Sequence, residues 1–197
     1  MEARENASGT VPARNGGPRS VTELIERLAR GERFKYVHFW GHEPRRDGAL
    51  SAACFSQWWP APFTVEQVTY ATAEHWMMAG KARLFDDTET ERRIIAASHP
   101  GQAKELGRSV RGFDDKLWQE RRFELVVRGN AEKFGQHPAL LDYLLATGSR
   151  VLVEASPVDR IWGIGLSADD DRAANPTEWR GLNLLGFALM EARHRLA

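Results

Sequence analysis

Glu74 and Lys81 pair an acid with an amine at a spacing that a helix converts into a shared face. They lie seven residues apart in a segment, residues 73–86, whose apolar period is helical, so two turns bring both side chains to one side. Met78, between them, indicates that this side is partly buried. Because a buried acid and amine are costly without a function, both are candidate catalytic residues. The alternative, which the spacing alone favours, is a solvated face that carries both charges.

A second group of polar residues directly follows an apolar run. Val151-Leu152-Val153 predicts a buried strand, and the segment 154–165 after it contains Asp159 and Trp162. Side chains at a strand end are held rigidly yet stay accessible, as a binding site requires. Gly163 allows unusual backbone angles or the close approach of a ligand. The alternative is structural, with Asp159 capping a short helical turn.

Arg180 and Asn183 form a third candidate group. Asn175–Glu178 combines an N-cap, a proline and a glutamate in the order that predicts a helix start, so the last helix is expected from here through Leu189. Free N–H groups at a helix N-terminus attract phosphate, and Arg180 would add a bidentate partner. The alternative leaves Arg180 on the surface and Asn183 bonded to a neighbouring turn.

The chain contains seven tryptophans, several of them in short clusters with polar or charged residues, as in 57–60, 116–118 and 159–163. A core position more often takes Leu or Ile, which have no N–H to satisfy. Flat rings beside carboxylates indicate a pocket that stacks a planar ring and acts on a bond next to it.

Composition excludes several other classes of protein. With 27 basic and 27 acidic residues the formal net charge is zero, which removes the broad electrostatic footprint of a nucleic-acid-binding protein while leaving room for a local basic groove. The six histidines lack metal-ligand spacing, and there is no phosphate-binding loop or serine-hydrolase elbow, so no metal and no cofactor are expected.

Sequence features also bear on the compartment of the cell. The single cysteine, Cys54, excludes an internal disulfide and fits a reducing environment. No apolar run approaches the ~20 residues that span a bilayer, and the first residues do not resemble a secretory signal. The expected location is the cytoplasm, with no membrane partner.

The periodicity predicts an α+β fold: a mainly helical single domain with a few short strands. Residues 1–19 have almost nothing to bury and are expected to be a disordered tail, followed by one domain over 20–197. Strands are expected at 36–40, 63–65, 68–70 and 151–153, and helices at 21–31, 73–86, 88–97, 99–107, 114–134 and 138–145, before the last helix.

In order along the chain, these segments resemble the NADAR family, also called the YbiA-like proteins. The resemblance covers about four-fifths of the chain, with departures at Gln57, where the family often has Asn, and at Met78, where Gln is frequent. The residues that carry it are Phe39-Trp40-Gly41, Trp59-Pro60-Ala61-Pro62-Phe63, Thr72-Ala73-Glu74-His75, Lys81-Ala82, Ala103–Arg108, Phe113-Asp114, Trp118, Lys133-Phe134, Leu145–Gly148, Glu154–Gly165 and Trp179–Gly186.

This resemblance implies an N-glycosidase that separates a heterocyclic base, or base amine, from a phosphorylated ribose. It implies Glu74 and Asp159 as acid, base or charge-stabilising groups. Lys81 offers a second route, in which a neutral amine traps the anomeric carbon as a Schiff base. The implied substrate-binding residues are Trp118 and Trp162 on the base, Arg180 and Asn183 on phosphate or ribose, Gly163, and Phe39; the other tryptophans, Trp58 among them, are then packing or rim residues.

Two substrates and one competing function remain open at this point. The resemblance implies either ribosylaminopyrimidine intermediates of riboflavin biosynthesis or ADP-ribose on guanine in nucleic acid. Zero net charge favours the small metabolite, whereas a rim formed by Arg108, Arg111, Arg121 and Arg122 would suit nucleic acid. The competing function is a non-catalytic module that binds ADP-ribose or a derivative of NAD. Such a module has no need for Glu74, Lys81 and Asp159 together.

Overall fold

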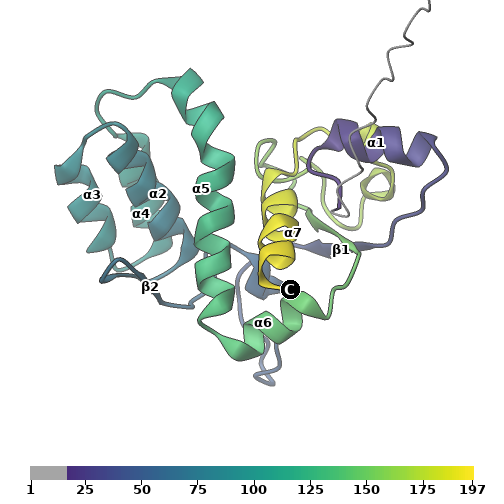
Figure 1. Ribbon diagram of the computed structural model, residues 1–197, viewed down its shortest axis with the longest axis horizontal. Coiled ribbons are helices and arrows are strands. Elements are labelled where there is room, and N and C mark those ends of the chain that lie inside the picture. Colours follow the sequence, from purple (N-terminus) through teal and green to yellow (C-terminus); the bar gives the residue numbers. More distant parts are fainter. Residues whose placement is uncertain (1–16) are drawn as a thin grey trace, which may run out of the picture.

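The computed structural model describes residues 17–197, so the predicted disordered tail at 1–19 lies almost entirely outside the described residues. One long helix, α5 (Asp115–Gly135), runs through the middle of the molecule (Figure 1). Helices α2 to α4 lie on one side of it, and α7, α1 and a small sheet lie on the other. This arrangement confirms the predicted α+β class, mainly helical with a few short strands.

The helices agree closely with the predicted segments, except at the last one. Glu74 and Lys81 both belong to α2. The described α-helices are α1 (Val21–Ala29), α2 (Ala73–Leu84), α3 (Thr88–Ile95), α4 (Pro100–Arg108), α5, α6 (Pro138–Leu145) and α7 (Leu184–Leu196), with 3₁₀ turns η1 (Ala52–Phe55), η2 (Asp171–Ala174) and η3 (Pro176–Glu178).

The strands form two pairs. β1 (Tyr36–Phe39) and β4 (Val151–Glu154) are parallel, and their register places Phe39 opposite Glu154. β2 (Phe63–Val65) and β3 (Val68–Tyr70) form the predicted hairpin. Its two connecting residues, Glu66 and Gln67, both have positive φ, as a type I′ turn requires. The parallel pair matters for function, because ligands in such sheets bind outside the carboxyl ends of the strands.

Close helix packing holds α2 in place against α5. A Cβ atom added at Gly129 of α5 would lie 2.2 Å from the Trp76 ring, so only glycine allows this approach. The ring nitrogen of Trp76 donates a hydrogen bond to the Leu125 carbonyl at 2.8 Å. Val126 and Val127 of α5 are fully buried in the same core. The helix that carries Glu74 and Lys81 is therefore rigidly seated.

The predicted start of the last helix is wrong. Asn175 caps the 3₁₀ turn η3, and Trp179 then takes an extended conformation that ends the turn. The next residues bond to the loop after β4 instead of forming a helix: the N–H of Arg180 donates to Ile164, and that of Asn183 donates to Gly163. Helix α7 begins only at Leu184, so Arg180 and Asn183 precede it rather than forming its first turns.

Two further features of the fold concern charge and surface. Asp87 is the N-cap of α3, where its side chain accepts from the N–H of Thr90.

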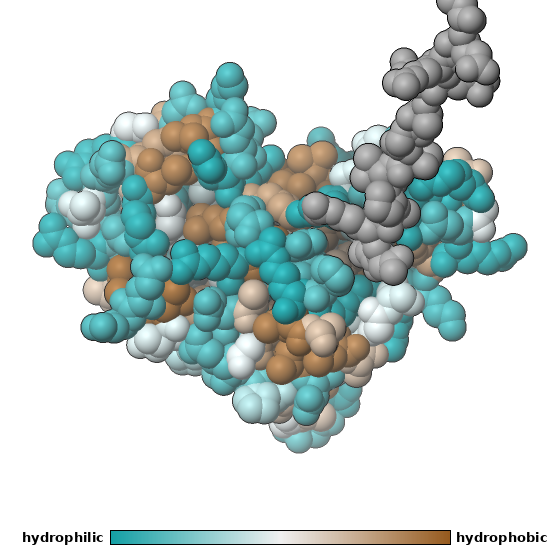
Figure 2. All heavy atoms as spheres, in the orientation of Figure 1, coloured by the Kyte–Doolittle hydropathy of each residue, from teal (hydrophilic) through white to brown (hydrophobic). Residues whose placement is uncertain are grey.

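On the face in Figure 2, apolar side chains gather in separate patches between polar areas. Within residues 17–197, no helix has the length and apolar character needed to cross a bilayer.

Candidate active site

A cavity of about 770 Å³ lies at the carboxyl ends of β1 and β4, between the loop after β4 and the helices α2, α4 and α5. Five predicted site residues line it: Glu74, Lys81, Trp118, Asp159 and Trp162. The others in its walls are Ser56, Gln57, Trp58, Met77, Met78, Lys104, Gly107, Arg108, Glu154, Val158, Arg160, Ile161 and Leu185. Its volume falls within the range of small-molecule sites.

Glu74 lies in the first turn of α2, where it is 3% exposed. Its N–H donates to the Gln57 carbonyl at 2.9 Å, which fixes the start of the helix to the neighbouring loop. Its Oε1 is buried without a hydrogen-bond partner among the described residues. Burial raises the pKa of Glu74 to about 7, against the opposing effect of Lys104. The alternative of a solvated face is therefore wrong for Glu74.

Glu154, the last residue of β4, is a second carboxyl group in the cavity that the sequence analysis did not single out. Its Oε2 is buried and has no hydrogen-bond partner among the described residues. Burial, and then the neighbouring carboxylates of Asp159 and Glu74, raise the pKa of Glu154 to about 8. The sequence signal for this residue was an acid directly after the apolar run Val151-Leu152-Val153.

Asp159 supplies the third carboxyl group, from the turn after β4. Its Oδ1 accepts two hydrogen bonds at 2.8 Å, from the N–H groups of Ile161 and Trp162. Its own N–H donates to the Ser156 hydroxyl. The turn is not helical, yet Asp159 organises it as a cap would. The structural interpretation is confirmed, since one oxygen of Asp159 holds the turn, and the residue also lines the cavity.

Lys81 is half-buried on the opposite wall. Its Nζ donates to the Gly107 carbonyl at 2.7 Å and lies 4.2 Å from the centroid of the Phe113 ring and 5.7 Å from that of Trp118. Burial lowers the pKa of Lys81 from its ordinary value, while Asp115 opposes this effect. A larger neutral fraction makes the amine a better nucleophile.

Aromatic rings form much of the remaining wall. Trp118 is 8% exposed, and Trp162 is partly buried. Trp58, assigned to packing or the rim from the sequence, also lines the cavity. Its loop is held by the fully buried Lys133, whose Nζ donates to the carbonyls of Cys54 and Ser56. These flat surfaces suit a planar heterocycle.

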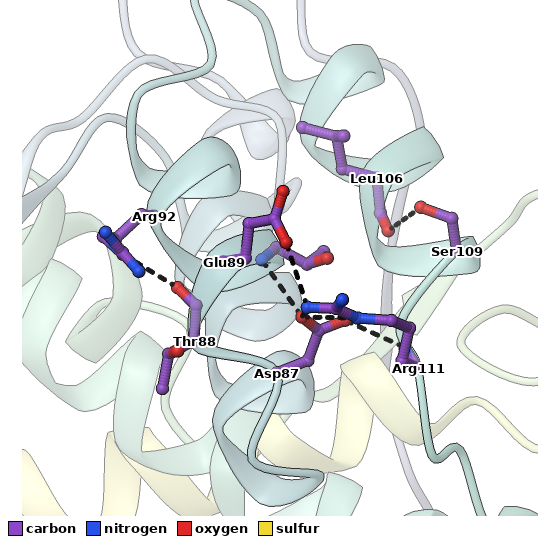
Figure 3. Close-up of polar contacts among 8 residues, drawn as sticks. Asp87, Thr88, Glu89, Arg92, Leu106, Ser109 and Arg111 are labelled. Atoms are coloured by element: carbon purple, nitrogen blue, oxygen red, sulfur yellow. Dashed lines mark hydrogen bonds and ion pairs between the residues drawn. The ribbon is translucent and has the colours of Figure 1, made fainter.

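Two cations reach the cavity from α4, namely Lys104 and Arg108. Arg108 thus agrees with the predicted basic rim, but Arg111 does not, because its guanidinium pairs with Asp87 at 2.7 Å and with Glu89 (Figure 3). Asp87 is buried where it accepts these bonds. Arg121 and Arg122 do not line the cavity.

The other four predicted site residues lie behind the cavity wall or away from it. Phe39 is buried edge-to-face against Phe55. Gly163 supports the turn, since its carbonyl accepts from the Asn183 N–H at 3.1 Å. Asn183 is fully buried, and its side chain bonds the strand β4 rather than the neighbouring turn that the structural alternative named. Arg180 is exposed and does not line the cavity.

This chain is similar to known proteins over most of its length. Residues 38–197 match the NADAR domain family. The chain is 42% identical over 164 residues to N-glycosidase R617 of Acanthamoeba polyphaga mimivirus, covering 81% of this chain and 95% of that protein. It is 32% identical over 143 residues to N-glycosidase Npun_R5314 of Nostoc punctiforme, covering 73% and 85%.

A solved structure shares the same fold. The NMR structure of the E. coli protein YbiA superposes with a TM-score of 0.66 at 27% identity, covering 84% of this chain and 86% of that one. The names of the relatives confirm the predicted enzyme class, a hydrolase of N-glycosyl bonds. With its family match extending over most of its length, this chain belongs to the NADAR family.

Proposed function

We propose that this protein hydrolyses the bond between a ring or exocyclic nitrogen of a heterocyclic base and the anomeric carbon of a phosphorylated ribose. The observation that carries the proposal is the convergence of Glu74, Glu154 and Asp159 with Lys81 in one cavity with tryptophan walls. Three carboxyl groups are unfavourable together unless one holds a proton and positive charge develops on the sugar as the bond breaks.

Glu154 is the proposed proton donor. Burial, and then two neighbouring carboxyl groups, raise the pKa of Glu154, whereas Lys104 and Arg108 oppose the effect of burial on the pKa of Glu74. When the bond between the anomeric carbon and nitrogen breaks, its electron pair stays on nitrogen and takes the proton of Glu154. The carboxylates of Glu74 and Asp159 then stabilise the oxocarbenium-like sugar until water adds and returns a proton to Glu154.

Lys81 provides an alternative course for the same hydrolysis. If the ribosylamine ring-opens, the neutral amine attacks the anomeric carbon and the base nitrogen leaves with a proton from a carboxyl group. The resulting Schiff base is hydrolysed by water, which restores the amine and releases the sugar. The hydrogen bond from Nζ to the Gly107 carbonyl holds the amine 5.7 Å from the centroid of the Trp118 ring.

The proposed substrate is either a ribosylaminopyrimidine phosphate or ADP-ribose on guanine. Both have a planar base for Trp118, Trp162 or Trp58 and phosphate for Lys104 and Arg108 on α4. A chain with no net charge suits the small metabolite, while the cations on α4 are placed to hold a single modified base.

The test is to incubate the protein with each substrate and follow free base and free sugar by mass spectrometry. Release from one substrate identifies it, and E154Q and E74Q should each lower kcat by roughly 10²–10⁴-fold. E120Q, at an exposed position on α5, is the matched control and should retain activity. Absence of cleavage, together with a rise in melting temperature on adding ADP-ribose, would instead establish a non-catalytic binding module.

A further inference from the structure

A second cavity, of about 920 Å³, lies at the other end of β4. Arg150 immediately precedes β4 and Lys35 immediately precedes β1, and both line this cavity, whereas the active site lies where these parallel strands end. A four-residue strand is about 13 Å long, so the two cavities are separated by the length of the sheet. Helix α7 also connects them, from Leu185 at the active site to Arg193 here.

The walls of this second cavity are strongly basic. Its cationic residues are Arg27, Arg33, Lys35, Arg150 and Arg193, and Glu32 is the only acidic side chain in the lining. Glu32 is already paired with Arg27 at 2.7 Å. The side chains of Arg33 and Lys35 are exposed and make no ion pair with another described residue. In a chain with no net charge, this is a local concentration of positive charge.

Arg193 is the buried cation of this cluster, with only 9% of the residue exposed. Its Nη1 donates to the Thr147 hydroxyl at 2.6 Å and to the Arg150 carbonyl at 3.0 Å, both neutral acceptors. No carboxylate among the described residues pairs with it. Burial, together with the nearby Arg150, lowers the pKa of Arg193 from its ordinary value. A buried guanidinium without a counter-charge is costly, and an anion in the cavity would offset that cost.

The cavity is partly made by residues outside the family match. Arg27, Arg33 and Lys35 come from α1 and the segment after it, before the match begins at residue 38, while Arg150 and Arg193 come from within it. The N-terminal segment thus adds cations to a face that already holds a buried arginine. Because both parts of the chain contribute cations, and not a cation and an anion, the cluster indicates a binding surface rather than a structural ion pair.

We propose that this cavity is a second binding site, which takes the phosphate groups of an anionic ligand. Arginine side chains from two sides suit phosphate oxygens, for which guanidinium groups provide paired donors. Two sources share this chemistry, a free phosphorylated small molecule and the backbone of a nucleic acid. The proposal does not depend on the reaction at the first cavity, because binding is measured here without turnover.

The test uses the full chain and two probes: pyrophosphate, followed by calorimetry, and a labelled single-stranded oligonucleotide, followed by fluorescence anisotropy. The double variant R33E/K35E changes two exposed residues of the cavity and should weaken binding of the correct probe at least tenfold. R92E/R93E, on α3, changes the net charge equally and should leave binding within twofold. Melting curves of both variants verify folding.

Each outcome decides the proposal. Selective loss of pyrophosphate binding assigns the site to small phosphorylated molecules, and selective loss of oligonucleotide binding, with a steep salt dependence, assigns it to a nucleic-acid backbone. The proposal is overturned if neither probe binds the unmodified protein at millimolar concentration. It is also overturned if R33E/K35E and R92E/R93E weaken binding equally, since net charge alone would then explain the effect.

Discussion

The side-chain oxygen of Asn183 accepts a hydrogen bond at 2.9 Å from the backbone N–H of Glu154. The amide nitrogen of Asn183 donates at 2.9 Å to the carbonyl of Leu152, two residues earlier on the same strand. Asn183 therefore takes the place of a neighbouring strand at the end of β4. It has positive φ, which asparagine tolerates better than most residues, and it leads directly into α7.

Replacing Asn183 with Ala should reduce both stability and activity. The Glu154 N–H and the Leu152 carbonyl would lose their partners, at a cost of about 1–3 kcal/mol for a buried group left unsatisfied. Glu154 would also lose its fixed position, so kcat should fall more than KM rises. N175A, which changes an exposed cap of η3, is the control. Equal melting temperatures and kcat values for N183A and N175A would contradict this role.

The raised pKa values of Glu74 and Glu154 predict that the folded protein loses stability as pH rises. Both groups titrate near 4.5 when unperturbed and near 7 and 8, respectively, when folded. The folded state therefore binds more protons between these values. The stability linked to these protons is fully present below about pH 4.5 and is lost as pH rises through 7 to 8.

E154Q provides the measurement. It removes one of these titrations, so relative to the unmodified protein it should gain stability at pH 9 compared with pH 5, as followed by urea unfolding at both values. E120Q is exposed and should show the same pH dependence as the unmodified protein. A pH dependence of E154Q indistinguishable from that of E120Q would remove the assignment of a proton to Glu154.

A role of Lys81 as a nucleophile can be tested by trapping its Schiff base. If the Schiff base forms, borohydride added during turnover will reduce it and attach the sugar covalently to Lys81, which peptide mass spectrometry detects. K81R keeps a donor for the Gly107 carbonyl but cannot form an imine, so it should fold, give no adduct and lose activity. K116R, at an exposed position, should behave as the unmodified protein. An active enzyme without any adduct assigns catalysis to the carboxyl groups.

Trp118 should contribute to substrate binding in a way that an exposed tryptophan does not. W118A removes a ring from the cavity wall, and loss of stacking on the base is expected to raise KM by about five- to 150-fold, corresponding to about 1–3 kcal/mol of stacking. Trp40 is 61% exposed and outside the cavity, so W40A is the matched control. Equal KM values for the two variants would show that Trp118 does not contact the base.

The ion pair of Arg111 with Asp87 should stabilise the segment that holds Lys81. Asp87 accepts from the N–H and the guanidinium of Arg111, which ties this segment to the start of α3 (Figure 3). Gly107 and Phe113, two of the contacts of the Lys81 amine, flank Arg111 in sequence. R111A should lower the melting temperature and kcat, whereas R93A, on the exposed side of α3, should change neither.

Local patterns were sufficient to predict most helices and strands, because apolar periodicity and capping residues act within a few positions. The predicted start of the last helix failed for a tertiary reason. Asn175 and Pro176 do begin a turn, but the backbone of residues 180–183 makes its hydrogen bonds with the loop after β4. No propensity of these residues encodes a partner some twenty positions away.

The candidate site was predictable to a similar degree. The i, i+7 spacing correctly brought Glu74 and Lys81 to one cavity, and the turn after β4 brought Asp159 there too. Glu154 and Trp58 were missed because their importance depends on which segments fold over them. Arg180 and Asn183 were predicted to lie in the first turns of the last helix, but α7 begins only at Leu184. The phosphate-binding role assigned to them depended on that predicted position.

The contact between Gly181 and Gly163 has a consequence for how this enzyme can diversify. A Cβ atom at Gly181 would lie 2.2 Å from the Gly163 carbonyl and 2.8 Å from Arg160, so the backbone that supports the Asp159 turn leaves no room for a side chain at this position. The cavity itself is lined in part by the flexible side chains of Met77, Met78 and Lys104. Changes of substrate are therefore expected more readily at Met77 and Lys104, on α2 and α4, than at the two glycines that support the Asp159 turn.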